Sequence, residues 1–122
     1  NKIITIHSNK NKTKAGSRFY IYAGDVADAI MFLITKGKAG QKYNIVGSKE
    51  IDNLTLAKFI NKILKNKIKY KMVDFHSARP GHDLRYALSG QKLKKMGWKP
   101  KDNTKKRLKQ TVEWTIKNKE WF

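Results

Sequence analysis

The apolar residues of this chain recur with two spacings that alternate along its length, and this alternation restricts the fold more than any other feature. Some segments place apolar side chains at every second position, as β-strands do, and others repeat them every three to four residues, as amphipathic helices do. Alternating strands and helices predict the α/β class. The expected strands are Lys2–Ser8, Phe19–Tyr22, Lys42–Val46 and Lys67–Asp74, and the expected helices are Asp25–Thr35 with Asp25 as its cap, Leu54–Lys65, Ser89–Met96 and Thr104–Asn118.

The segments between these elements are predicted loops. Asn9–Ser17 and Phe75–Asp83 are rich in polar residues, Gly or Pro, and Gly37 and Gly40 end the first helix. Apolar residues surround most of that helix, so we expect it to be largely buried. The aromatic residues Phe32, Phe59 and Trp114 fall on apolar helix faces and are predicted core residues.

Length and residue usage exclude several classes of protein. A chain of 122 residues suits one domain. The absence of cysteine excludes disulfides and cysteine-based zinc sites. The longest apolar run, Ala29–Ile34, is far shorter than the roughly 20 residues of a membrane span, and no signal-peptide core lies near Asn1. We therefore expect a cytoplasmic protein, and a first residue other than Met suggests a piece of a longer chain.

The formal net charge of +19 allows two interpretations. A basic nucleic-acid-binding module would concentrate its positive charge on one element, and phosphate and base readers favour Arg. Here 28 basic residues include only four arginines, and the lysines are spread over most of the predicted helices, strands and loops. Lys, Asn and Ile are all abundant, which is typical of a low-GC genome. We favour this compositional origin and keep the nucleic-acid module as an alternative.

Known catalytic motifs are absent from the sequence. It contains no G-x-S-x-G, no Walker loop, no G-x-G-x-x-G and no Tyr-x-x-x-Lys pair, and its three histidines lack metal-ligand spacing. We therefore expect no complete active site on this chain alone.

The segment Ser77–Tyr86 is the first candidate site. Arg79 and His82 flank Pro80 and Gly81, which stiffen and turn the loop. The planar guanidinium fork fits phosphate oxygens, and the imidazole adds a donor, so a diphosphate is a natural ligand. The alternative is a surface turn in which Asp83 pairs with Arg85.

Asn53 and Arg18 are two further candidates. Asn53 stands where a helix begins, so it is either a plain N-cap or part of a phosphate site that uses the free N–H groups and dipole of the helix end. Arg18 follows the turn at Gly16 and opens an aromatic strand.

Five motifs, in order and in register, resemble one enzyme family. The segment Arg18–Ile30 resembles "R-x-(W/F)-x-(Y/I)-V-x-D-V-A-x-A" of the extended short-chain dehydrogenases, and Tyr43–Gly47 matches "Y-N-I-G-G". Arg79–Leu88 matches "R-P-G-H-D-x-R-Y-A-(I/L)-D" except at Ser89, which replaces the final Asp. The specific string, R-P-G-H-D-x-R-Y, is typical of nucleoside-diphosphate-sugar 4,6-dehydratases of the dTDP-glucose type. The other two motifs are "K-L-x-x-L-G-W-x-P" on Lys92–Pro100 and "T-V-x-W" on Thr111–Trp114.

The resemblance implies a C-terminal sugar-nucleotide-binding domain over residues 1–122, with a small mixed sheet and packed helices. It assigns the nucleotide diphosphate of a sugar nucleotide such as dTDP-glucose to Arg18, Asn53, Arg79 and His82. NAD and the catalytic residues belong to an N-terminal Rossmann domain that is absent here, so this chain alone is expected to bind no NAD and to be inactive. A related sugar-nucleotide epimerase is the alternative.

The implied partners are the nucleotide sugar, the protein's own N-terminal Rossmann domain and a second copy of the complete enzyme in a homodimer, with no specific nucleic acid and no membrane. If such a domain normally covers this chain, we expect an exposed apolar face on the helix Val26–Ile34 and on the strand Phe19–Tyr22.

Overall fold

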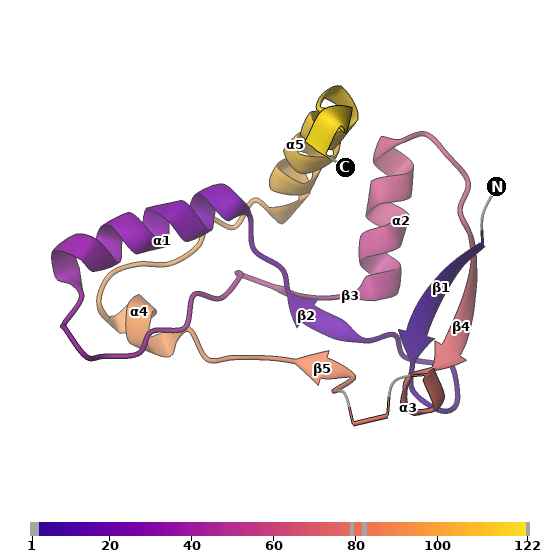
Figure 1. The fold of residues 1–122 in the computed structure, drawn as a ribbon, viewed down its shortest axis with the longest axis horizontal. Helices are drawn as coiled ribbons and strands as arrows, with labels where there is room; N and C mark the ends of the chain where they lie inside the picture. The colour runs from indigo at the N-terminus through magenta and orange to yellow at the C-terminus, as the bar shows by residue number, and fades with distance from the viewer. Residues whose placement is uncertain (1–2, 79, 82, 122) are drawn as a thin grey trace.

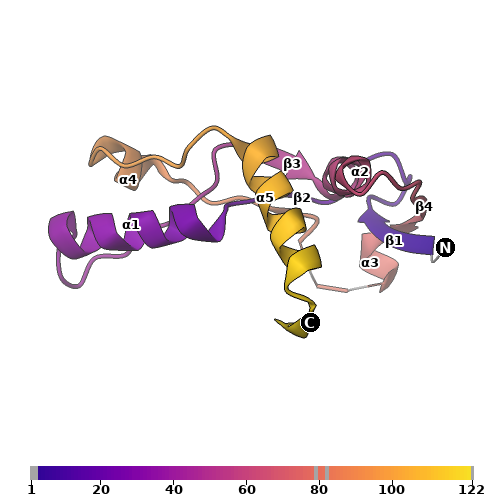
Figure 2. The ribbon, with the colours of Figure 1, turned by 90° about the horizontal axis from the view of Figure 1, so that it is seen from above.

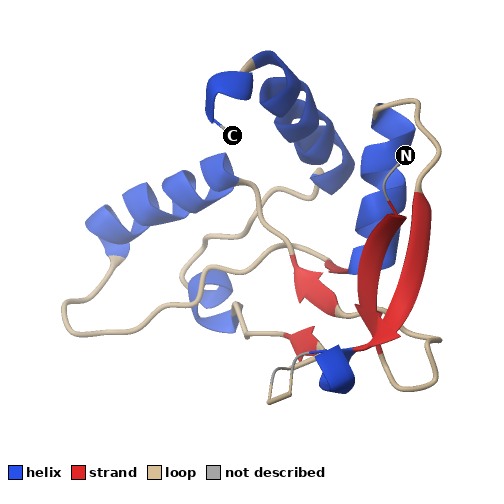
Figure 3. Ribbon diagram, turned by 45° about the vertical axis from the view of Figure 1, so that its right-hand side comes forward, coloured by secondary structure: helices blue, strands red, loops and turns tan. Residues whose placement is uncertain are grey.

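The computed structural model describes residues 3–78, 80–81 and 83–121, which form two separate small sheets with helices around them (Figures 1 and 3). In the first sheet, β1 (Ile3–Ser8) and β4 (Lys69–Asp74) run parallel. The second sheet has the order β3-β2-β5, in which β2 (Ser17–Phe19) is antiparallel to β3 (Glu50–Asp52) and parallel to β5 (Arg85–Tyr86). This arrangement confirms the predicted α/β class with a small mixed sheet.

The helices lie on different sides of these sheets. α1 extends to one side of the molecule, whereas α2 and α5 stand side by side (Figures 1 and 2). The helical bounds are α1 Ala23–Lys36, α2 Asn53–Ile63, α3 Phe75–Ala78, α4 Gln91–Lys95 and α5 Thr104–Lys117, followed by the 3₁₀ helix η1 Lys119–Trp121.

The first sheet is held by hydrogen bonds and by one buried contact region at its carboxyl end. Ser8 is fully buried, and its hydroxyl donates to the carbonyl oxygen of Val73 at 2.9 Å. The His7 ring meets the buried Phe75 ring edge to face, with centroids 5.7 Å apart. The first contact fixes the end of β1 against β4, and the second fixes it against α3.

The expected strand Lys42–Val46 is wrong, because that segment makes no ladder with any described strand. Side chains hold it instead: the Lys92 ammonium donates to the Lys42 carbonyl oxygen at 2.8 Å, and the Asn44 amide donates to Ser89 at 3.2 Å. A strand requires a neighbour to accept its backbone hydrogen bonds.

Three other boundaries differ from the expectations. The strand expected at Phe19–Tyr22 runs from Ser17 to Phe19, since Tyr22 already caps α1. The loop expected at Phe75–Asp83 begins with the short helix α3, because Asp74 accepts a hydrogen bond from the Ser77 backbone N–H at 3.3 Å. β5 lies where no strand was expected.

The predictions for α1 are wrong in two respects. Asp25 is not the cap but lies inside the first turn, where it is buried. The helix is not largely buried, because Ile30, Met31 and Ile34 are 49%, 62% and 70% exposed. The apolar face expected on this helix is therefore present and uncovered, whereas residues 19–22 are only partly exposed. Trp114, a predicted core residue, is also exposed.

The molecule is open for its size. Its accessible surface is 9398 Å², whereas a compact folded chain of 14.1 kDa would expose roughly 6,700 Å². The buried apolar side chains lie on separate elements rather than in one cluster: Ile6, Ala29, Phe75, Leu93 and Val112. None of the described helices is long and apolar enough to cross a lipid bilayer.

Candidate functional site

The centre of the candidate site is β2, the middle strand of the second sheet, which carries Arg18. In the parallel register Arg18 lies opposite Tyr86 on β5. Its guanidinium carbon stands 4.3 Å from the centroid of the Tyr86 ring, and its Nη1 donates to the Ser17 carbonyl oxygen at 3.0 Å. A cation over an aromatic face is stabilised and held in orientation.

Asn53 lies beside Arg18, at the point where β3 passes into α2. The antiparallel register pairs Ser17, the first residue of β2, with Asp52, so Asn53 lies beside the start of β2. Its backbone N–H donates to the Gly16 carbonyl oxygen at 2.8 Å. The structure thus brings together two of the four predicted site residues, which are 35 positions apart in the sequence.

The interpretation of Asn53 as the N-cap is wrong, because Asp52 caps α2. The Asp52 carboxylate accepts hydrogen bonds from the backbone N–H and the hydroxyl of Thr55, at 2.9 and 2.6 Å. Burial raises the pKa of Asp52, but the hydrogen bonds from Thr55 and from neighbouring backbone amides outweigh it and leave the pKa lowered. The first N–H groups of α2 are therefore occupied, and a phosphate would meet the Asn53 side chain rather than the helix end.

The two ends of the Asn53 amide have different roles. The Tyr20 hydroxyl donates to Asn53 Oδ1 at 2.5 Å. Burial raises the pKa of Tyr20, although the nearby Arg18 charge lowers it, so the hydroxyl stays protonated as a donor at neutral pH. Because Tyr20 occupies the amide oxygen, the N–H groups of Asn53 Nδ2 are the part that a phosphate oxygen can accept from.

Gly16 allows the chain before β2 to pass close to Leu84, the residue before β5. A Cβ at position 16 would lie 2.9 Å from the Leu84 carbonyl oxygen and 3.5 Å from Asn53 Nδ2. The Ser17 N–H donates to the same Leu84 carbonyl at 3.1 Å. A side chain at position 16 would therefore separate β2 from β5.

Arg79 and His82, the other two predicted site residues, lie outside the described residues. Their neighbour Arg85 is described, and it binds Glu50 rather than Asp83. Arg85 Nε and Nη2 donate to the two Glu50 carboxylate oxygens at 2.7 and 2.9 Å. The predicted alternative, a pair between Asp83 and Arg85, is therefore wrong.

A cleft of about 400 Å³ opens beside Arg18. Its lining includes the charged residues Arg18, Asp83 and Arg85 and apolar residues such as Val46 and Leu88. Its volume lies within the roughly 300–1,000 Å³ of typical small-molecule sites. Arg18 and a set of apolar side chains together suit an anion that carries an organic group.

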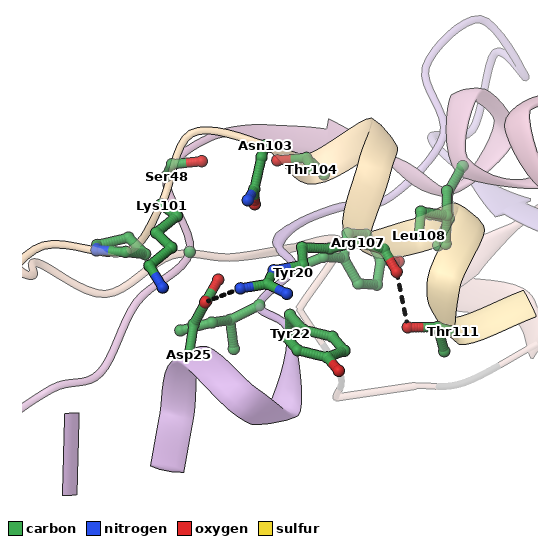
Figure 4. Close-up of a pocket in the computed structure, with 14 residues that line it drawn as sticks. Tyr20, Tyr22, Asp25, Ser48, Lys101, Asn103, Thr104, Arg107, Leu108 and Thr111 are labelled. Carbon is green, nitrogen blue, oxygen red and sulfur yellow. Dashed lines mark hydrogen bonds and ion pairs between the residues drawn. The ribbon is translucent and has the colours of Figure 1, made fainter. Parts of the chain in front are cut away.

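A second cavity, of about 210 Å³, lies between the start of α1 and α5 (Figure 4). Arg107 Nη2 binds Asp25 at 3.3 Å, and its guanidinium carbon stands 4.5 Å from the Tyr22 ring centroid. Arg107 Nε and Asn103 Oδ1 are buried without a hydrogen-bond partner among the described residues. Sequence reasoning missed the pair of Arg107 and Asp25, because no motif in the sequence links two residues that are 82 positions apart.

No known protein-family profile matches the chain. It is 34% identical to the dTDP-glucose 4,6-dehydratase of Escherichia coli, over an alignment of 131 positions that covers 99% of this chain and 35% of the relative. The chain thus spans about a third of the length of the relatives that it matches.

Solved structures give the same result. The dTDP-glucose 4,6-dehydratase of Bacillus anthracis in complex with NAD matches 99% of this chain and 37% of its own, with a TM-score of 0.78 and 30% identity. The dTDP-glucose 4,6-dehydratase of Streptomyces venezuelae with NAD and TYD bound matches 98% of this chain and 36% of its own, with a TM-score of 0.80 and 27% identity.

Proposed function

We propose that this chain, which belongs to the NAD-dependent nucleoside-diphosphate-sugar dehydratase and epimerase family of extended short-chain dehydrogenases, holds the nucleotide diphosphate of the substrate of a 4,6-dehydratase. The observation that carries the proposal is the position of Arg18 and Asn53 at the second sheet, where β2 pairs with β3 and Arg18 lines a cleft of about 400 Å³. A positive fork and an amide donor together match two adjacent phosphates.

Arg79 and His82 complete the proposed site on the basis of sequence alone. They belong to the R-P-G-H-D-x-R-Y string, whose described end, Arg85–Tyr86, is β5 beside Arg18. dTDP-glucose is the proposed substrate because the relatives at 34–37% identity carry that name.

NAD does not fit the described part of this chain. A dinucleotide pyrophosphate rests where a glycine-rich turn leads from a strand into a helix. The glycines with positive φ, Gly40, Gly81 and Gly97, lie in none of the strand-to-helix turns that the structure describes. We therefore assign NAD, which supplies hydride transfer, to a separate Rossmann domain of the same protein and derive no step from it here.

The task of these residues is binding and orientation. Arg18 offsets diphosphate charge, Asn53 Nδ2 donates to a phosphate oxygen, and Tyr20 holds the Asn53 amide in place. With the diphosphate fixed, the attached sugar is constrained in position, which lowers the entropic part of the barrier to the reaction. In this proposal the chain fixes the substrate, and the catalytic groups belong to the rest of the protein.

Titration of dTDP into the whole protein, as the cell makes it, tests the proposal. Arg18→Gln removes one charge-assisted phosphate contact and should weaken dTDP about 10- to 100-fold. Arg79→Ala should have a similar effect. Lys117→Gln removes one positive charge from α5, away from the second sheet, and should change the affinity less than twofold. Unchanged affinity for dTDP in Arg18→Gln would contradict the proposal.

A related epimerase is the second candidate, since both reactions share this type of substrate domain. Product analysis separates them: a dehydratase converts dTDP-glucose to a 4-keto-6-deoxy sugar, whereas an epimerase returns a 4-epimer. The nucleic-acid module remains an alternative on charge alone. Its binding would fall steeply with salt concentration.

The remaining partners are also proposals. A Rossmann domain of the same protein would cover the exposed face of α1, where Ile30, Met31 and Ile34 lie. A homodimer of the complete enzyme and a cytoplasmic location accompany the same family assignment. No specific nucleic acid and no membrane enter the proposal.

A further inference from the structure

The second sheet carries an ion-pair network on the side opposite Arg18. Arg85 donates to both carboxylate oxygens of Glu50, and the Ser17 hydroxyl donates to Glu50 Oε1 at 2.6 Å. A guanidinium bound by two parallel hydrogen bonds is fixed in direction as well as in position. The network therefore joins side chains from all three strands, β2, β3 and β5.

This network matters because β5 is very short. Its two residues pair in parallel with β2, a weaker arrangement than antiparallel pairing, and they do not contact β3 through the backbone. The Glu50–Arg85 pair spans β2 and links the two outer strands directly. It therefore adds a constraint on β5 that the backbone ladder does not supply.

β5 in turn carries the ring that orients Arg18. Neighbouring side chains on a strand leave it on opposite faces, so when Glu50 holds Arg85 on one face, the Tyr86 ring is held on the other. That ring lies against the Arg18 guanidinium at 4.3 Å. Glu50 thus acts on Arg18 through Arg85 and Tyr86.

We infer that Glu50 and Arg85 are positioning residues for the diphosphate site, which fix the Arg18 guanidinium from the far side of the sheet. The inference rests on the proposed function, because it assigns a purpose to the orientation of Arg18. Arg85 also lines the cleft, and in this inference it acts through its bond to Glu50 rather than by binding the phosphates. Hydrogen bonds from Arg85 and Ser17 lower the pKa of Glu50 to about 2, so the pair is ionised across the physiological range.

A charge-swap experiment in the whole protein tests this role, with dTDP and thymidine as probes. Glu50→Gln and Arg85→Lys each break the two-bond fork and should weaken dTDP about 5- to 20-fold. Thymidine lacks the phosphates, so its affinity should change less than twofold. The double variant E50R/R85E restores the pair in reverse and should return dTDP affinity to within about threefold of the parent.

The neighbouring pair of Lys49 and Asp102 provides a matched control. It is also an ion pair at the surface, with a separation of 3.1 Å, but it does not include β5. Lys49→Gln should leave the affinity for both probes unchanged.

Four results would be decisive. If Arg18→Gln weakens dTDP and Glu50→Gln does not, the positioning role is wrong and the proposed function stands. If the single variants weaken dTDP and the swap fails to restore it, Arg85 contacts the phosphates directly and the inference is wrong. If the single variants weaken dTDP and thymidine equally, the pair supports the fold only. If Arg18→Gln itself has no effect, the proposed function fails first.

Discussion

At the residue scale, the Asn53 side-chain amide has two functions: its oxygen makes a structural hydrogen bond, and its nitrogen is proposed to bind the substrate. Asn53 Oδ1 accepts a hydrogen bond from the Tyr20 hydroxyl, and the Nδ2 group is the part proposed to bind a phosphate oxygen. The amide can rotate by half a turn only if it loses the bond from Tyr20. The orientation that a phosphate requires is therefore set before the phosphate binds.

Tyr20→Phe tests whether the orientation of the Asn53 amide depends on the Tyr20 hydroxyl. Loss of the hydroxyl leaves Asn53 Oδ1 without its partner, so the free energy of unfolding should fall by about 1 kcal/mol and dTDP should bind a few-fold more weakly. Urea unfolding and calorimetric titration measure the two effects. Tyr70→Phe, at a ring that is 41% exposed on β4, is the control and should change neither. An unchanged affinity in Tyr20→Phe would show that Asn53 needs no such support.

Glu50 makes stability depend on pH in a direction that can be checked. Its pKa is lowered from 4.5 to about 2 in the folded chain by hydrogen bonds from Arg85 and Ser17. A carboxyl with a lowered folded pKa stabilises the fold above its unfolded pKa and loses this effect as the pH falls through the folded value. Thermal melts of the parent and of Glu50→Gln should thus differ at pH 7 and converge as the pH approaches 2. A difference that persists at pH 2 would contradict this assignment.

At the element scale, the Arg107–Asp25 pair fastens α5 to the first turn of α1. The side chains are 21% and 5% exposed, so water screens the pair little. Arg107→Met leaves the Asp25 carboxylate buried without its partner, and the free energy of unfolding should fall by about 3 kcal/mol. Urea unfolding measures this change.

The matched control for this prediction is the exposed Lys109–Glu113 pair on the same helix, at 3.7 Å. Glu113→Gln should change the stability by less than about 0.5 kcal/mol. Equal effects in Arg107→Met and Glu113→Gln would mean that burial does not strengthen the Asp25 contact.

The elements that sequence reasoning predicted correctly are those that carry their own signal. α5 repeats apolar residues along one face and begins at Thr104, as predicted. The predicted strand Lys67–Asp74, which is observed as β4, alternates lysines with Ile68, Tyr70 and Met72. The segment Lys42–Val46 has a strand pattern too, yet it forms no strand, because pairing depends on a neighbour that its own residues do not specify. A single sequence gives the tendency of a segment and not the presence of its partner.

In the candidate site too, local sequence signals predicted individual residues but not their long-range partners. Arg18 and Asn53 could be nominated because a turn and a helix start mark their positions in the chain. The partners that hold them could not, since Tyr86 is 68 positions from Arg18 and Tyr20 is 33 positions from Asn53. The assignment of Asn53 as a cap failed because two adjacent residues, Asp52 and Asn53, both suit that position, and only the backbone path decides between them.

At the scale of the whole molecule, the uncovered apolar surface predicts self-association when this chain is produced alone. Ile30, Met31 and Ile34 form an exposed stripe on α1. The double variant Ile30→Lys/Ile34→Lys should lower the binding of a hydrophobic dye and shift the chain toward monomer in sedimentation experiments. Lys36→Gln, at the end of the same helix, should do neither. Strong dye binding in the double variant would show that the dye-binding apolar surface is not this stripe on α1.

The charge of the whole molecule predicts a salt effect on substrate capture. A net charge of +19 attracts an anionic sugar nucleotide over long distances, and salt screens this attraction. Stopped-flow association of dTDP should slow as salt rises from 50 to about 200 mM, while the dissociation rate changes little. An association rate that is independent of salt would show that the lysines do not assist binding.

The parallel pairing of β1 with β4 also determines when the chain can fold. Each residue of β1 pairs with one that follows 66 positions later, from Ile3 with Lys69 to Ser8 with Asp74. During synthesis at about 5–20 residues per second, β1 leaves the ribosome several seconds before its partner exists. Ile6, which is buried in the fold, stays in water for that time, so β1 is made before β4 and is secured only once β4 follows.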